Sequence, residues 1–288
     1  NISDFLDTAI FNNIMAAQGA QKTEYASLMG IFGSQFNTLI NVPLSVATAL
    51  AASLIPSLVA TVQTGSRKQV HSKINTAIRF NMMIAIPCAV GLTILAKPLM
   101  DLLFYTEDNT TAALMLQLGA VSVVFFCPST LTNSVLQGLD DMMTPVKNSS
   151  IALVVHVVSL LVMMVAFKWN IYAVVMSRTI FAATVYMLNS HALRERVGYV
   201  QEKKRTFILP TIAALIMGAA AVIVHLLFEL FAGTRIATIF ALLAAVPTYG
   251  IALVLLGAVT EDEIESMPKG ALLLSICRKM HLFRDVYR

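Results

Sequence analysis

The sequence predicts an all-α membrane protein, a polytopic bundle of about eight transmembrane helices. Hydrophobic residues make up 57% of the 288 residues and charged residues only 12%, whereas a soluble domain carries about 25% charged residues. The mean hydropathy is +0.76. A membrane-spanning helix needs roughly 20 mostly apolar residues. Because lipid offers the backbone no hydrogen bonds, apolar runs of that length are predicted to be helices.

The apolar runs divide the chain into eight predicted helices. They are expected at residues 1–19, 25–63, 72–104, 109–138, 144–167, 170–192, 206–231 and 235–258. We expect residues 1–195 to form a lobe of six helices, residues 196–260 to add two more, and residues 261–288 to form an amphipathic tail. The first helix is less apolar than the others and starts without a methionine. The expectation is therefore that it is the truncated first helix of this lobe within a longer protein.

Basic residues are distributed unequally between the two sides of the predicted membrane. When loops are counted alternately, 14 fall on one side and only Lys22, Lys168 and Arg235 on the other. Lys and Arg in short loops resist translocation, so the rich side, which includes the C-terminus, is predicted to be cytoplasmic. The net charge of +4 then reflects topology and contact with anionic membrane lipids. No nucleic-acid partner is expected, because no aromatic and basic pattern typical of such proteins is present.

The sequence offers no motif for enzyme chemistry. Cys88, Cys127 and Cys277 lack the spacing of a metal site, and we expect them to be small packing residues. A His-Glu metal motif, a phosphate-binding glycine loop and a nucleophile elbow are all missing from the sequence. We therefore predict that the protein is not an enzyme and has no cofactor.

A polar stripe runs along the second predicted helix, inside a stretch from 25 to 66 that contains no charged residue. Thr38, Asn41, Ser45 and Thr48 recur at spacings of three and four residues, so they share one helix face. Small residues of this kind favour close helix packing in membranes. The alternative is that they line a water-filled cavity, and Asn41 favours it because a buried amide needs a partner.

Charged residues within the predicted helices are the strongest candidates for a functional site. Arg178 lies eight residues inside the sixth helix, where an arginine costs about 2.5–3.5 kcal/mol even on a lenient insertion scale. It should therefore face a cavity or a carboxylate partner. Asp4, Asp7 and Asn12 cluster in the first helix and invite a monovalent cation or a proton as a coupling ion. The alternative is that the two carboxylates lie at the membrane border.

Three further positions are cavity candidates. His156 and Ser159 lie on a stripe of small and polar residues in the fifth helix, with His156 near mid-span. Arg79 lies in one half of the third helix, and Lys97 lies in the other. The alternatives are that His156 is a packing residue and that Arg79 and Lys97 extend to opposite membrane surfaces.

A family resemblance is carried by four segments in a fixed order. They are NVPLSVATALAASLIPSLV, AIRFNMMIAIPCAVGLTILAKPLMDLLF, LQGLDDMMTPVKNS and EDEIESMPKG. This chain resembles the polysaccharide biosynthesis and stage V sporulation protein B family, which is related to MurJ-type lipid II flippases and, more distantly, to the MATE multidrug exporters. The similarity covers nearly the whole chain. It corresponds to the second six-helix lobe of such a transporter, followed by two further helices.

The resemblance implies a site as well as a fold. Two lobes would rock about a central cavity and carry a lipid-linked sugar precursor across the bacterial cytoplasmic membrane. Thr38 and Asn41 match the cavity-facing second helix of the lobe, and Arg79 matches a basic residue of the third. Asp7 lies in the helix where related flippases place an acidic cation-binding residue. One position departs from the pattern, since Thr38 stands where MurJ-type proteins commonly carry an arginine.

The main hypothesis is a flippase for a lipid-linked oligosaccharide or peptidoglycan precursor. Its expected partners are that precursor, membrane lipids and an N-terminal lobe of the same chain. Two alternatives remain. A MATE-like exporter of cationic drugs would have the same fold but would need anionic or aromatic groups in its cavity. A membrane scaffold without transport activity would have no need of charged residues within its spans.

Overall fold

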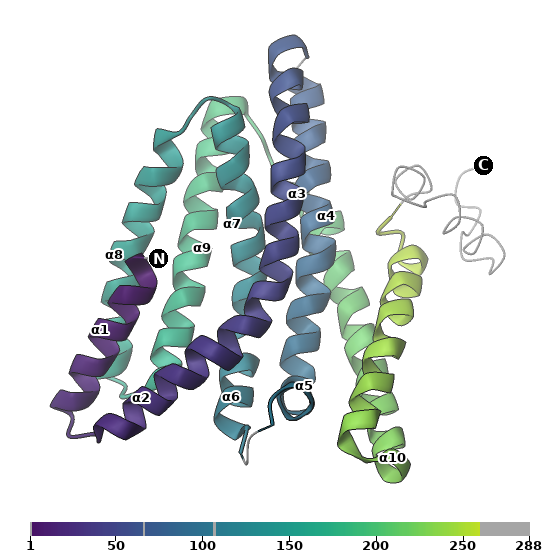
Figure 1. Cartoon of the computed structure of the whole chain (residues 1–288). Helices are drawn as coiled ribbons and strands as arrows, with labels where there is room; N and C mark the ends of the chain where they lie inside the picture. Colours follow the sequence, from purple (N-terminus) through teal and green to yellow (C-terminus); the bar gives the residue numbers. More distant parts are fainter. Residues whose placement is uncertain (1, 66, 106–107, 260–288) are drawn as a thin grey trace. The chain divides into compact units, whose positions relative to one another are not determined.

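The computed structural model describes residues 2–65, 67–105 and 108–259, which are almost entirely helical and contain no strand (Figure 1). The all-α prediction is confirmed. The chain forms two compact units, Asn1–Gln201 and Glu202–Arg288. The helices of the first unit are α1 (Ile2–Ala17), α2 (Lys22–Ile31), the π-helical turn η1 (Phe32–Phe36), α3 (Asn37–Thr64), α4 (Arg67–Ile94), α5 (Ala96–Leu103), α6 (Thr110–Gly119), α7 (Val121–Gly138), α8 (Met143–Val165) and α9 (Ile171–Val197).

Two predicted helices are interrupted. The predicted helix 72–104 ends as α4 at Ile94 and resumes as α5 at Ala96. Pro98 explains the break, because a proline ring clashes with the carbonyl four residues earlier, which here belongs to Ile94. The predicted helix 109–138 is bent by 48° between α6 and α7, directly after Gly119.

Gly119 lies where α6 closely approaches η1 and α9. A Cβ atom built on Gly119 would overlap the ring of Phe36 and lie 2.7 Å from Cγ1 of Val175. We expect Gly119→Ala to destabilise the protein by about 1–3 kcal/mol, the usual cost of overpacking a close contact. Thermal unfolding in detergent checks this. Gly33→Ala is the matched control, since nothing lies within 4 Å of the added atom. If both variants lose the same amount of thermal stability, the loss in Gly119→Ala does not come from overpacking.

The helices are long enough to form a polytopic bundle. Among the described residues, five segments have the length and hydropathy to cross a membrane, and the bent pair α6–α7 makes a sixth. The 16-residue α1 is shorter than a full span, and the last segment, residues 204–255, consists of two helical arms. With α1 and the two arms counted separately, the segments correspond to the eight predicted helices.

Helix α8 has one face buried in the bundle and one face exposed on its outside. From Ala152 onward its buried residues recur at every fourth position and are Ala152, His156, Leu160 and Met164. Over residues 151–165 the exposed face is apolar as well and consists of Ile151, Val154, Val155, Val158, Leu161, Val162 and Val165. An apolar exterior of this kind suits lipid. Because His156 lies on the inward face, α8 presents a titratable side chain to the interior of the bundle.

One end of the first unit collects the turns that were predicted to be cytoplasmic. The connection from α3 to α4, the turn from α7 to α8 and the end of α9 lie together at the top of Figure 1. Asp141 accepts hydrogen bonds from the backbone nitrogen and the hydroxyl of Thr144 at 3.2 and 2.7 Å and pairs with Arg196 at 2.8 Å. Burial raises the pKa of Asp141, but the Thr144 bonds and the nearby Arg196 and Lys147 outweigh it and lower the pKa overall. Asp141 thus holds the start of α8 against α9.

The second unit is a helical hairpin preceded by a π-helical turn, η2 (Lys204–Ile208). Its helix α10 (Leu209–Leu255) reverses at Gly233, whose φ of 77° and ψ of 162° are non-helical and suit glycine. Beside the reversal, the rings of Phe228 and Phe240 stack with centroids 4.4 Å apart. Residues 260–288, which include the predicted tail and Cys277, lie outside the described residues.

Candidate functional site

Arg178 is the centre of a charged cluster inside the first unit. It projects from α9, and its Nε donates to Oδ2 of Asp7 at 3.1 Å. Its Nη1 donates to Oδ1 of Asn37 at 3.0 Å, and its Nη2 pairs with Oδ1 of Asp4. The ring of Phe32 lies 5.0 Å from the guanidinium carbon. The structure therefore places Arg178 against carboxylates and beside a cavity, as its depth in the membrane required.

Asp7 links α1 to the rest of the bundle. Its side chain is 1% exposed, and its Oδ1 lies 2.7 Å from Nε2 of His156 on α8. The same face of α1 buries Phe11 and Met15, which follow Asp7 at intervals of four residues. Both carboxylate oxygens of Asp7 are engaged, one by an imidazole and the other by a guanidinium. Asp7 thus holds α1 against α8 and α9.

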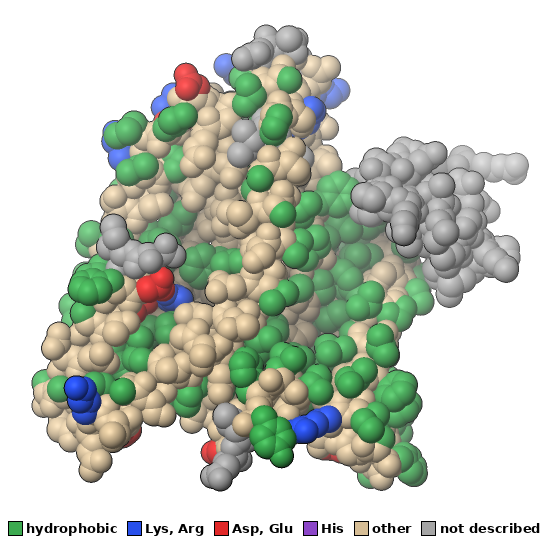
Figure 2. Space-filling view, viewed as in Figure 1, with side chains coloured by type: hydrophobic (Ala, Val, Ile, Leu, Met, Phe, Trp, Pro, Cys, Tyr) green, Lys and Arg blue, Asp and Glu red, His purple; other side chains and the backbone are tan. Residues whose placement is uncertain are grey.

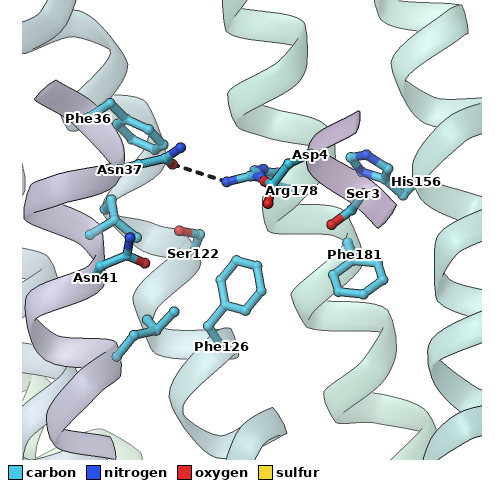
Figure 3. A pocket seen from close by; sticks show the side chains of 12 residues that line it. Ser3, Asp4, Phe36, Asn37, Asn41, Ser122, Phe126, His156, Arg178 and Phe181 are labelled. Atoms are coloured by element: carbon cyan, nitrogen blue, oxygen red, sulfur yellow. Dashed lines mark hydrogen bonds and ion pairs between the residues drawn. The ribbon is translucent and has the colours of Figure 1, made fainter. Parts of the chain in front are cut away.

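A cavity of about 350 Å³ opens beside this cluster (Figure 3). Its wall combines charged and amide groups with aromatic rings, contributed by α1, η1, α3, α7, α8 and α9. The lining residues are Ser3, Asp4, Phe36, Asn37, Ile40, Asn41, Leu44, Ser122, Phe126, His156, Arg178 and Phe181. Figure 2 shows acidic and basic surface side by side in a hollow midway along this unit, away from the charged residues at its two ends. A charged cavity midway along a membrane bundle is suited to holding a polar group within the bilayer.

The formal charge of the cluster is set by two carboxylates and one guanidinium. With neutral His156, the side chains of Asp4, Asp7 and Arg178 sum to −1, and with protonated His156 the sum is zero. The ring of Phe181 contacts His156 edge-on, with centroids 5.9 Å apart. Arg178 is therefore compensated, and this site is not a cationic surface.

Helix α3 presents a different face to the cavity from the one that the polar stripe suggests. Asn41 is the member of the predicted stripe that lines the cavity. Thr38, Ser45 and Thr48 are exposed outside its lining, and their hydroxyls donate to the backbone carbonyls of Ser34, Asn41 and Leu44. Hydroxyls that bond within their own helix need no partner from a neighbouring helix. The roles predicted for these three residues remain predictions.

Other predicted site residues are dispersed. Arg79 is buried in α4, and Ser159 donates to the backbone carbonyl of His156 at 2.8 Å. Asn12 is half-buried on α1, five residues after Asp7. None of the three is among the residues that line the described cavity. Lys97 pairs with Asp101 at 3.2 Å on α5.

Sequence reasoning missed Asn37, which accepts a hydrogen bond from Arg178, and Phe32, which covers its guanidinium. A signal was present for Asn37, because it lies four residues before Asn41 and so shares its face. Phe32 and Phe36 had no such signal, because aromatic residues are equally typical of lipid-facing positions.

Comparisons with known sequences identify the family of this chain. The family model described as MurJ, lipid II flippase MurJ, matches residues 35–246. The chain is 25% identical to lipid II flippase MurJ of Bacillus subtilis strain 168 over 239 residues, which is 79% of this chain and 42% of that protein. It is 25% identical to a probable lipid II flippase MurJ of Bdellovibrio bacteriovorus over 230 residues, 75% of this chain and 43% of that protein. A third relative is the uncharacterized membrane protein YabM of Bacillus subtilis, 25% identical over 91% of this chain and 49% of that protein.

The fold and the site together define a polytopic membrane protein with a charged internal cavity. This chain belongs to the MurJ lipid II flippase family. The predicted relationship to MurJ-type flippases is confirmed. The chain spans less than half the length of the curated relatives that it matches.

Proposed function

We propose that this chain is the C-terminal lobe, with two further helices, of a flippase for a lipid-linked oligosaccharide or peptidoglycan precursor. The observation that carries the proposal is Arg178, held midway along the bundle at the wall of a cavity that also presents the amides of Asn37 and Asn41. A guanidinium is the side chain best suited to a phosphate group, and the amides offer hydrogen bonds to a sugar. The acyl chains of the precursor would remain in lipid.

Transport would proceed by alternating access of two lobes in the bacterial cytoplasmic membrane, with the basic end of the bundle on the cytoplasmic side. A bound group shifts such an equilibrium only by its different affinity for the two states. The free-energy barrier for moving the polar head group across the bilayer is lowered, because fixed charges and amides of the cavity take the place of water around it. The second lobe would supply the rest of the cavity wall.

The coupling ion that fits this site best is a proton. Asp7 already has both oxygens engaged, by Arg178 and by His156. A metal cation would have to displace one of these partners, whereas a proton taken up by His156 displaces neither. Uptake of that proton gives His156 a positive charge that balances the surplus carboxylate. The formal charge of the cluster would then change from −1 to zero.

A cationic cargo is the second candidate, and the surplus carboxylate favours it. Asp4 lies at the cavity wall with Phe36, Phe126 and Phe181, and carboxylates and aromatic rings are the groups that attract organic cations. A MATE-like exporter would use these residues. The family relationship favours the lipid-linked precursor, since the curated relatives with a stated activity are lipid II flippases.

The two candidates are distinguished by reconstitution of the intact protein into lipid vesicles. One series carries labelled lipid II and measures translocation of its head group; the other carries a fluorescent organic cation and measures its release. We expect protein-dependent translocation of lipid II, with no movement of a labelled phospholipid as the control for a leaky bilayer. Release of the cation in vesicles that do not translocate lipid II would overturn the proposal in favour of the exporter.

A further inference from the structure

A guanidinium has five N–H donors, and protein groups already hold Arg178 at all three of its nitrogens. Each of its three nitrogens is engaged, Nε by Asp7, Nη1 by Asn37 and Nη2 by Asp4. The ring of Phe32 covers one face. If the proposed function is correct, an anionic head group that binds Arg178 while all of these partners keep their places lies beside the Asp4 carboxylate and is repelled, so tight binding requires one partner to give way. The identity of that partner follows from burial.

Asp4 is the partner that can leave at the smallest cost. Its side chain is 46% exposed, whereas that of Asp7 is 1% exposed and is also held by His156. Removing Asp7 from Arg178 would leave a buried carboxylate without its guanidinium partner, which is strongly destabilising. Asp4 can instead exchange the guanidinium for water. Asn37 is neutral, and its departure would leave the repulsion between Asp4 and an incoming anion unchanged.

We propose that Asp4 occupies the anion site of Arg178 when no cargo is bound and that a phosphate group of the cargo takes its place at Nη2. This inference rests on the proposed function and adds the order of events at the same site. With Asp4 in place, the cluster carries a surplus negative charge and repels a phosphate. Once Asp4 has moved away, Arg178 and Asp7 balance each other, and protonated His156 makes the remaining site cationic.

The exchange connects cargo binding to movement of α1. Asp4 lies in the first turn of α1, one turn before the anchor Asp7. Loss of the Asp4 pair therefore removes one contact between this first turn and α9, while Asp7 keeps its own contacts with α8 and α9. Asp4 also acts as a filter, because a ligand that competes poorly with a carboxylate for a guanidinium does not displace it.

The test is binding of inorganic pyrophosphate to the purified intact protein, measured by calorimetry in detergent at fixed salt and pH. We expect D4N to bind pyrophosphate about tenfold more tightly than the wild type, since a charged competitor is replaced by a neutral one of the same size. R178Q should abolish binding in either background. E24Q is the matched control, because it removes an exposed carboxylate on α2 outside the cavity, and its affinity should equal that of the wild type.

The possible outcomes distinguish failure of the exchange at Asp4 from failure of the anion site at Arg178. If R178Q abolishes binding while D4N binds no more tightly than the wild type, Arg178 remains the anion site and the exchange at Asp4 is wrong. If R178Q binds as well as the wild type, or if neither the wild type nor D4N binds, the anion site itself fails and the exchange fails with it. Thermal unfolding of each variant establishes that it is folded, and D4S replaces D4N if the amide variant is not.

Discussion

Replacing Asp7 with alanine is expected to produce the largest loss of stability of any single substitution in the site. The variant leaves Arg178 without its buried partner and His156 without its acceptor. Removing one partner of a buried ion pair typically costs about 3–5 kcal/mol, because the remaining charge stays buried without compensation. Thermal unfolding in detergent measures the loss, and α1 should detach first because Asp7 holds it to α8 and α9.

The same experiment carries its own controls. Glu195→Ala removes a carboxylate from the pair with His191, whose two side chains are each 69% exposed, and such exposed pairs are worth roughly 0.2–1 kcal/mol. The double variant Asp7→Ala with Arg178→Leu removes both charges and should recover part of the stability lost by Asp7→Ala alone. If Asp7→Ala and Glu195→Ala have the same melting temperature, the cluster is not the anchor of α1.

Replacing Arg178 with glutamine is expected to produce the largest loss of transport. Hydrogen bonds to a charged group contribute about 1.5–3 kcal/mol each, so losing even one to the head group lowers the apparent affinity for lipid II roughly tenfold to a hundredfold. Arg178→Lys keeps the charge but loses the planar guanidinium, which can donate to several oxygens at once. Its affinity for lipid II should therefore lie between those of the wild type and Arg178→Gln. The initial rate of lipid II translocation, measured against lipid II density in vesicles, gives both affinity and maximal rate.

Controls for this prediction come from basic residues away from the cavity. Lys168, in the turn between α8 and α9, is exposed, and Lys168→Gln should leave the affinity for lipid II unchanged. Arg79 is the other basic candidate that the sequence suggested, and it is buried in α4 outside the cavity lining. The assignment of Arg178 is wrong if Arg79→Gln lowers the affinity and Arg178→Gln does not.

The sequence by itself determined the class of protein and the need for a partner at Arg178. Long apolar runs in a medium without hydrogen-bond partners leave helices as the solution. Pro98 accounts for the break between α4 and α5, and it was visible in the sequence, although the prediction did not use it. A guanidinium within a span must be compensated, so the depth of Arg178 alone required a carboxylate or a cavity, and the structure provides both.

Only the tertiary structure decided which residues meet. Asp7, His156 and Arg178 lie on α1, α8 and α9, and their juxtaposition depends on how these helices pack. The sequence pointed to Thr38, Asn41, Ser45 and Thr48 on α3, whereas the cavity takes Asn41 from this stripe and adds Asn37, one turn before it. In water, apolar periodicity distinguishes the inner face of a helix from the outer one. In lipid both faces are apolar, so the inward face of a helix is fixed only by its neighbours.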